Sequence, residues 1–261
     1  MLIDVHAHLT GDEYDGVGGV SGMLSRMKAD GVERVIASGY DVATSIRSKE
    51  LSEEHEEVFF CAGFHPSELA RFQDGDWERL EELCTHEKCV AVGEIGLDYH
   101  FENNPEKSVQ KEAFLRQLQI ADRLGLPVVI HSRDAAEDTF ELLSQHQELL
   151  KYGGLMHCYS YSPEMLLRFA ELGLYFSFGG TSTFKNAKKV WASVQCVPAP
   201  RILSETDCPY LAPVPLRGTF PNEPKNVRYV VENLAALREV SREEMEKQIE
   251  ENARALFLKL K

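Results

Sequence analysis

The sequence lacks the long apolar runs, repeats and excess of basic residues that would distinguish this chain from an ordinary globular protein. No apolar run approaches the ~18 residues that a transmembrane helix needs, and no repeat or low-complexity tract is evident. Basic residues are scarce: 28 Lys and Arg stand against 42 Asp and Glu, which gives a net charge of −14. This deficit argues against a broad basic surface for nonspecific binding of nucleic acid, although it permits local phosphate contacts.

Cysteine pairs with the spacing of metal-binding or redox motifs are also missing. The six cysteines form no C-x-x-C motif, and the closest two, Cys84 and Cys89, are separated by four residues. We therefore expect reduced, mostly buried thiols, as in an intracellular protein. Because a strand-like run follows Met1 directly, we expect no signal peptide, no membrane association and a cytoplasmic location.

What the sequence does contain is an alternation of short apolar runs with helix-like segments. Apolar runs that barely alternate with polar residues favour a parallel sheet covered by helices. With 261 residues and no linker-like break, we expect one domain (1–261) of the α/β class, a (β/α)8 TIM barrel. A doubly wound open sheet is the alternative. The expected strands are 2–8, 33–38, 58–63, 89–94, 127–131, 154–157, 174–178 and 201–205.

The expected helices fill the intervals between these strands. A glycine-rich loop (11–22) and a proline-rich, ordered loop (209–224) are expected where the pattern breaks. The last helix should begin at Ser241, which opens a capping box with Glu244. The helices are expected at 20–30, 44–56, 77–86, 105–124, 135–150, 163–172 and 186–196, with two more at the end of the chain.

Two histidines stand where the first strand ends. Residues i and i+2 of a strand point to the same side, about 7 Å apart at a rise of ~3.3 Å per residue. His6 and His8 could therefore face one metal ion, although two incidental histidines would give the same spacing. The later strands favour the metal site, because ligand types recur at their carboxyl ends, where parallel barrels carry their active sites. These residues are Glu94, His131, His157 and Asp207, and His65 follows the third strand.

The ligand types predict two cations rather than one. Four histidines and two carboxylates are too many for one four-coordinate ion, but they suit two ions ~3.5–4 Å apart that share a carboxylate. Glu94, from a middle strand, is the expected bridge. Imidazoles favour zinc, manganese, iron or cobalt, and carboxylates also admit magnesium. We expect His6, His8 and Asp207 to hold one ion with Glu94, and His131 and His157 to hold the other.

The charge balance of such a centre favours an anionic substrate oxygen. Two divalent ions carry +4, whereas Glu94, Asp207 and a hydroxide carry −3, which leaves about +1 to attract a phosphate. Asp207 could also take or orient the proton of the nucleophile. His65, Arg133 and Arg217 are candidate substrate contacts, as is Lys185, although rim salt bridges would explain the basic residues equally well. Glu205 is expected to orient a ligand, and Asp98 either fixes a turn or takes part in the chemistry.

Six short motifs resemble those of the TatD family of metal-dependent deoxyribonucleases, within the metal-dependent amidohydrolase superfamily. The resemblance runs in register from residue 3 to about residue 226. It implies a distorted TIM barrel with metal ligands at the six positions that the strand ends indicate. The motifs are Asp4-Val5-His6-Ala7-His8, Gly63-Phe64-His65-Pro66, Gly93-Glu94-Ile95-Gly96-Leu97-Asp98-Tyr99, His131-Ser132-Arg133, His157-Cys158 and Glu205-Thr206-Asp207-Cys208-Pro209-Tyr210.

One stretch departs from the family pattern. The family commonly reads Arg-Gly-Lys-Arg-Asn-Glu-Pro after the Pro-Tyr-Leu-Ala-Pro run. This chain has one residue more and lacks the second basic pair, so two potential phosphate contacts are lost and tight binding of a long DNA strand is less expected. Here the sequence is Arg217-Gly218-Thr219-Phe220-Pro221-Asn222-Glu223-Pro224.

These observations predict a metal-dependent deoxyribonuclease that acts on DNA ends or short oligonucleotides by exonucleolytic cleavage. Asp207 and Glu94 are the expected catalytic residues, two metal ions (Zn, Mn or Mg) activate the water, and the protein is a monomer or weak oligomer. A small-molecule amidase, lactonase or deacylase on the same centre is the first alternative. A non-catalytic metal-binding protein is the second, although every ligand position of the matched motifs is intact.

Overall fold

The computed structural model contains eight parallel strands that neighbour one another in chain order. It describes residues 2–260, so Met1 and Lys261, the ends of the expected domain, lie outside the described residues. Seven parallel ladders join successive strands. The strands are β1 (Leu2–Ala7), β2 (Val32–Ser38), β3 (Val58–Ala62), β4 (Cys89–Asp98), β5 (Val128–Arg133), β6 (Gly154–Met156), β7 (Tyr175–Phe178) and β8 (Ile202–Ser204).

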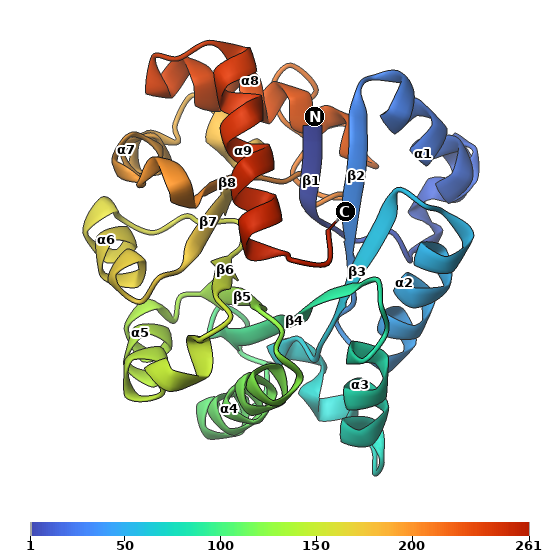
Figure 1. Cartoon of the computed structure of the whole chain (residues 1–261), viewed down its shortest axis with the longest axis vertical. Coiled ribbons are helices and arrows are strands. Elements are labelled where there is room, and N and C mark those ends of the chain that lie inside the picture. The colour runs from blue at the N-terminus through green and yellow to red at the C-terminus, as the bar shows by residue number, and fades with distance from the viewer. Residues whose placement is uncertain (1, 261) are drawn as a thin grey trace.

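Helices surround the strands in a ring, and one further helix lies over the middle of the ring (Figure 1). Within residues 2–260, no helix is long and apolar enough to span a bilayer. The helices are α1 (Gly19–Ala29), α2 (Val42–Glu54), α3 (Asp76–Cys84), α4 (Lys107–Leu124), α5 (Ala136–Gln145), α6 (Pro163–Glu171), α7 (Lys188–Cys196), α8 (Val227–Arg238) and α9 (Arg242–Leu256).

The ends of the sheet meet just beyond β1 and β8, so the barrel is nearly closed. The backbone N–H of Asp207 donates to the carbonyl of His6 at 3.0 Å, and His8 N–H donates to Cys208 O at 2.7 Å. An open, doubly wound sheet would leave these two edges apart. The (β/α)8 prediction is therefore confirmed, with the closing contacts at the carboxyl end of the strands.

β4 is longer than predicted and bends at Glu94. The sequence pattern ended this strand at residue 94, but it continues to Asp98 after a register shift against β5. The Glu94 N–H donates to Gly39 O, beyond β2, so β4 crosses the end of β3. The crossing requires Gly63, because a Cβ there would lie 2.6 Å from the carbonyl carbon of Gly93. Glu94 is thereby carried toward the middle of the barrel.

Other boundaries differ from the predicted ones for local reasons. α2 begins at Val42 because Asp41 caps it, accepting from the Thr44 N–H at 2.7 Å. The expected loop at 11–22 contains a 3-10 helix (Asp12–Val17) and the start of α1. The helix expected at 135–150 is broken at His146, where α5 gives way to a 3-10 turn. The capping box at Ser241 is confirmed.

The end of the chain covers the amino ends of the strands, opposite the closing contacts described above. Asn252 of α9 donates from Nδ2 to the carbonyls of Ala199 and Ile202, at the start of β8, both at 2.8 Å. Lys259 Nζ donates to His86 O, just before β4, at 3.1 Å. These bonds fix α9 across the barrel mouth.

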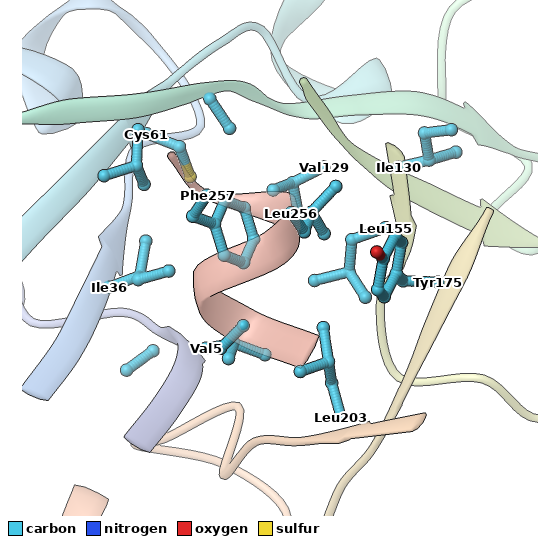
Figure 2. Close-up of a cluster of buried hydrophobic side chains, with 14 of the residues drawn as sticks. Val5, Ile36, Cys61, Val129, Ile130, Leu155, Tyr175, Leu203, Leu256 and Phe257 are labelled. Atoms are coloured by element: carbon cyan, nitrogen blue, oxygen red, sulfur yellow. The ribbon is translucent and has the colours of Figure 1, made fainter. Parts of the chain in front are cut away.

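Leu256 and Phe257 enter the barrel interior from α9 and are buried (Figure 2). The neighbouring Leu258 points away and is 77% exposed. Burial of an aromatic ring in a close-packed interior is a large apolar contribution to stability. Figure 2 places the two side chains among inward residues of the strands, including Val5, Ile36, Cys61, Val129 and Leu155.

We expect Phe257→Ala to lower the free energy of unfolding by about 3–5 kcal/mol, because it leaves a cavity at the base of the barrel. Leu258→Ala, the adjacent exposed position, should change it by no more than about 0.5 kcal/mol. Chemical denaturation of both variants measures the difference. Equal destabilisation by the two substitutions would contradict the role assigned to Phe257.

Candidate metal centre

The six predicted ligands converge at the carboxyl ends of the strands. His6 lies in β1 and His8 just beyond it, Glu94 lies at the bend within β4, and each of the other three comes from the last part of a different strand or just beyond it. The centre is well enclosed: His6 is fully buried and Glu94 is 3% exposed. The remaining members are His131 at the end of β5, His157 after β6 and Asp207 after β8.

One group of donors gathers around a single oxygen of Glu94. Glu94 Oε2 lies 3.4 Å from His6 Nε2 and 3.6 Å from His8 Nε2. Asp207 Oδ1 lies 3.6 and 3.4 Å from the same two nitrogens, which are 3.4 Å apart. Four ligands at 2.0–2.1 Å around a tetrahedral ion are spaced about 3.3–3.4 Å from one another. His6, His8 and Asp207 therefore form a group that could hold one divalent ion, and Glu94 Oε2 lies beside the two histidines.

A second group gathers around the other oxygen. Glu94 Oε1 lies 2.9 Å from His131 Nδ1 and 2.8 Å from His157 Nε2, and these nitrogens are 3.3 Å apart. These separations are those of charge-assisted hydrogen bonds, so the group is more compact than the first. Glu94 thus presents one oxygen to each of two donor groups, the arrangement expected of a bridging carboxylate.

The outer nitrogen of each β1 histidine contacts Ser38, at the end of β2. His8 Nδ1 lies 3.1 Å from the Ser38 carbonyl oxygen, which can only accept, so Nδ1 carries the proton. When the ring is neutral, the lone pair of His8 is therefore on Nε2, which faces the donor group. His6 Nδ1 lies 3.0 Å from the Ser38 hydroxyl. Metal-binding histidines are held by such partners on their outer nitrogens.

Carboxylates hold the outer nitrogens of the other two histidines. His131 Nε2 lies 3.2 Å from Asp98 Oδ2, which leaves Nδ1 for Glu94. His157 Nδ1 lies 3.6 Å from Glu205 Oε1, and both atoms are buried without a closer hydrogen-bond partner among residues 2–260. Ser177 donates its hydroxyl to the other Glu205 oxygen. Asp98 and Glu205 thus contact ligand side chains from outside the donor groups.

His65 has the opposite arrangement. Its Nδ1 accepts a hydrogen bond from the Ser67 N–H at 3.2 Å, so the proton of the neutral ring is on Nε2. Nε2 lies 3.6 Å from Glu94 Oε1. Burial, together with the nearby His131, lowers the pKa of His65 to about 3, which keeps the ring neutral. His65 is therefore a hydrogen-bond donor to the cleft rather than an electron-pair donor.

The electrostatics of the centre favour an ionised carboxylate among cationic partners. Burial alone would raise the pKa of Glu94, but the charge of His157 and hydrogen bonds from His131 and His157 hold this pKa well below its usual value. Burial opposes protonation of His157, yet Glu94 and Glu205 raise its pKa well above the usual value. A divalent cation and protons compete for such donors.

Asp4 connects the two segments that close the barrel beside the centre. It is fully buried, and its Oδ1 accepts from the N–H groups of Thr206 at 2.9 Å and His6 at 3.3 Å. The Thr206 hydroxyl donates to Oδ2. Asp207 follows in the left-handed region, with φ of 53°, which turns its side chain back toward β1.

A glycine allows the close approach of β4 and β5. Gly96 pairs with His131 in the ladder, and a Cβ on Gly96 would lie 1.9 Å from the His131 carbonyl oxygen. Its φ of +143° is also one that residues with side chains rarely adopt. Gly96 therefore allows β4 and β5 to bring Glu94 and His131 within contact.

The donor groups form the floor of a cleft of about 680 Å³. His65 and Arg133, both predicted substrate contacts, line it, as does Asp98. Arg217 and Lys185 are exposed residues outside the lining, and the Arg217 guanidinium stacks 4.1 Å from the centre of the Phe184 ring.

From the sequence, Glu205 is expected to orient a ligand and Asp98 is a candidate, but sequence reasoning missed Ser38, Asp4 and Ser177. Ser38 ends the second strand, so the rule that indicated the other strand-end residues could also have indicated it. Asp4 shares its side of β1 with His6 and His8 by simple alternation, which was a usable signal. Nothing in the sequence pointed to Ser177.

We expect Ser38→Ala to weaken binding of one divalent ion about 10–100-fold, the usual effect of removing the partner of a metal-binding histidine. Of the two histidines, only His6 loses a contact, because His8 uses the Ser38 backbone carbonyl; the thiol of Cys61 also loses the hydroxyl as its acceptor. Titration calorimetry with zinc or manganese measures the affinities. Ser48→Ala, at a buried serine of α2 without a hydroxyl partner, is the matched control. Equal affinities in both variants would exclude this role for Ser38.

Comparison with known proteins identifies the family to which this chain is similar. A family model described as "TatD related DNase" matches residues 3–258. The "uncharacterized metal-dependent hydrolase YabD" of Bacillus subtilis (strain 168) is 42% identical over 98% of this chain and 99% of that protein. The similarly described YcfH of Escherichia coli (strain K12) is 37% identical over 98% and 96%.

A solved structure agrees at the level of the whole fold. The crystal structure of YJJV, a TatD homologue from Escherichia coli K12, superimposes with a TM-score of 0.91 at 30% identity, covering 98% of both chains. The family match over nearly the whole chain and the identity to YabD confirm the resemblance carried by the motifs. This chain belongs to the TatD family of metal-dependent hydrolases.

Proposed function

We propose that this chain is a metal-dependent phosphodiesterase that removes nucleotides from DNA ends or short oligonucleotides. The observation that carries the proposal is the sharing of Glu94, whose two oxygens face two separate donor groups. Paired cations bridged in this way are typical of phosphatases, polymerases and nucleases. The description of the matching family as a DNase supports the same substrate class.

The donor groups would hold two divalent ions. When bound, such ions lower the pKa of water toward ~7 and neutralise charge that develops on phosphoryl oxygens. The imidazole-rich sets favour zinc or manganese, and the carboxylates admit magnesium. His6, His8 and Asp207 would serve the first ion, His131 and His157 the second, and Glu94 both.

Asp207 is the proposed proton acceptor. Burial would raise its pKa, but a hydrogen bond from His8 and the charge of His6 lower it, so the carboxylate is ionised at neutral pH. Asp207 lines the cleft, where it can take a proton from the attacking water. Glu94 is the second proposed catalytic residue, and it acts by holding both donor groups in register.

His65 and Arg133 are the proposed substrate contacts. His65 Nε2–H faces the cleft beside Glu94 and can donate to a phosphoryl oxygen. Arg133 is exposed at the end of β5 and can reach an adjacent phosphate. Arg217 lies outside the cleft lining, so it would contribute only to a substrate that extends over the rim.

The six free cysteines support a reducing compartment, and we propose the cytoplasm. Four of them, Cys61, Cys84, Cys89 and Cys208, are buried thiols. Disulfides are rare where glutathione and thioredoxin keep thiols reduced. We propose a monomer or weak oligomer in that compartment.

A small-molecule hydrolase on the same centre is the second candidate. The cleft volume suits a single small ligand, and Glu13 and Glu68 line it beside the basic residues. An amidase, lactonase or deacylase would need no long basic track, which agrees with the net charge of −14.

Metal add-back tests the nuclease proposal. After chelation, restoring manganese, zinc or magnesium should restore shortening of end-labelled single-stranded DNA, and the product ladder should show stepwise removal from one end. Asp207→Asn should lose at least about 10²-fold in rate, the contribution of a positioned proton acceptor, while its thermal melting stays cooperative. Full activity of this variant would exclude the assigned mechanism.

A substrate screen separates the two candidate functions. We expect the metal-loaded protein to hydrolyse bis(4-nitrophenyl) phosphate and to leave lactones and N-acyl amino acids intact. The reverse selectivity, from protein shown to carry bound ions, would favour the small-molecule hydrolase. If no ions bind under any loading condition, the result would instead favour a non-enzymatic binding protein that retains the barrel.

A further inference from the structure

Three aromatic side chains are left largely in water at one end of the barrel. Phe101, Tyr210 and Phe220 are 51%, 52% and 59% exposed. Every other Phe, Tyr and Trp among residues 2–260 is at least partly covered. Phe101 follows β4, and the other two follow β8, so all three stand at the carboxyl ends of the strands. Exposed apolar surface gathered beside a functional centre marks a binding surface.

Tyr210 is connected directly to the metal centre. Its backbone N–H donates to the carbonyl of Asp207 at 3.1 Å, and its side chain lines the cleft together with Asp207. The aromatic ring therefore stands beside the position where the reacting group of a substrate must lie.

Phe220 is held beside Tyr210 by a buried asparagine. Asn222 is fully buried, donates from Nδ2 to Tyr210 O at 2.8 Å, and donates from its N–H to Pro209 O at 2.8 Å. The Tyr210 and Phe220 ring centres are 6.2 Å apart and tilted by 39°. Rings in this relation support each other without covering their outer faces. The pair is a fixed aromatic surface on an anchored loop.

Phe101 differs from this pair. It stands on the opposite side of the barrel, since β4 and β8 are four strands apart around it. The Arg133 guanidinium lies 5.1 Å from its ring centre and covers one face. Phe101 already has a cationic partner, whereas the ring contacts of Tyr210 and Phe220 within residues 2–260 are only with each other.

We propose that Tyr210 and Phe220 form a stacking platform for an unpaired nucleobase of the substrate, next to the phosphodiester that is cleaved. The proposal rests on the phosphodiesterase function proposed above. Bases stack on aromatic side chains without regard to sequence, and the contact needs no basic residue. It therefore suits a chain with a net charge of −14 that carries Thr219 and Phe220 in place of a basic pair.

The platform selects single-stranded ends. Bases inside a duplex are stacked on their neighbours and present no free face, so an enzyme that reads a base face needs a single strand or must extrude the base. A frayed or single-stranded terminus offers such a face at no unpairing cost. The expected order of preference is single-stranded over blunt duplex ends.

A binding measurement tests the platform without turnover. Metal-loaded protein is titrated into a short, non-hydrolysable single strand that carries a fluorescent aminopurine, whose emission is quenched by stacking. Tyr210→Ala and Phe220→Ala should weaken binding about tenfold and reduce the quenching, which is the loss of one stacked base. Tyr210→Phe and Phe220→Tyr should retain the binding affinity and the quenching, because each keeps an aromatic ring. Leu167→Ala, an exposed residue of α6, is the control.

Kinetics separate this proposal from the proposed function. For the wild type, an oligonucleotide with abasic terminal nucleotides should have a KM about tenfold above that of the intact strand, at similar kcat. The alanine variants should have this raised KM on the intact oligonucleotide as well as on the abasic one. If the variants hydrolyse DNA with an unchanged KM, the stacking platform is overturned and the proposed phosphodiesterase function still stands.

If the wild type hydrolyses neither oligonucleotide, the proposed function fails. The fluorescence titration then determines whether Tyr210 and Phe220 still bind a nucleobase. Quenching that the two alanine variants lose would retain a nucleobase site. Absence of quenching in the wild type, or tighter binding of an aromatic peptide than of the single strand, would overturn it.

Discussion

The candidate metal centre depends on one buried carboxylate, Glu94, whose two oxygens contact two separate groups of donor residues. An ionised carboxylate is costly to bury unless cationic or hydrogen-bonding partners surround it. Glu94 is 3% exposed and meets these partners through both oxygens. Its position requires β4 to bend across β3, which in turn requires Gly63, and requires β4 to approach β5 closely, which requires Gly96. The local irregularity of the barrel is therefore a condition for the site.

The histidines differ in what holds their outer nitrogens, and this difference assigns their chemistry. Carbonyl, hydroxyl and carboxylate oxygens contact the outer nitrogens of His6, His8, His131 and His157. His65 instead accepts a backbone N–H there. Rings that look equivalent in the sequence are thus divided into four whose inner nitrogens are free for a cation when the rings are neutral and one whose inner nitrogen donates a proton.

The sequence predicted the barrel and the convergence of the six donor residues for one physical reason. Parallel strands bring their carboxyl ends to one face, and alternate residues share a side, so His6, His8 and Asp207 could be placed together before any coordinates. The partners were harder, because a contact such as Ser177 to Glu205 depends on the register between neighbouring strands. The direction of Arg217 depends on its loop, where an aromatic neighbour holds the guanidinium. The crossing of β4 over β3 depends on backbone packing that apolar periodicity does not encode.

The closing contacts of the barrel join its first strand to the segment that follows its last strand. Asp4 and Thr206 are 202 residues apart, and α9 packs against both β1 and β8. A ribosome releases the amino end first, so the His-x-His strand emerges long before its partner. The conformational entropy lost when segments this far apart in the sequence are brought together is offset only once their contacts have formed. In a nascent chain, His6 and His8 therefore stay apart from Asp207 until β8 and the residues after it have been synthesised. In this architecture, the candidate cation-binding side chains come together only after strands from both sides of the closing seam have been synthesised and have folded together.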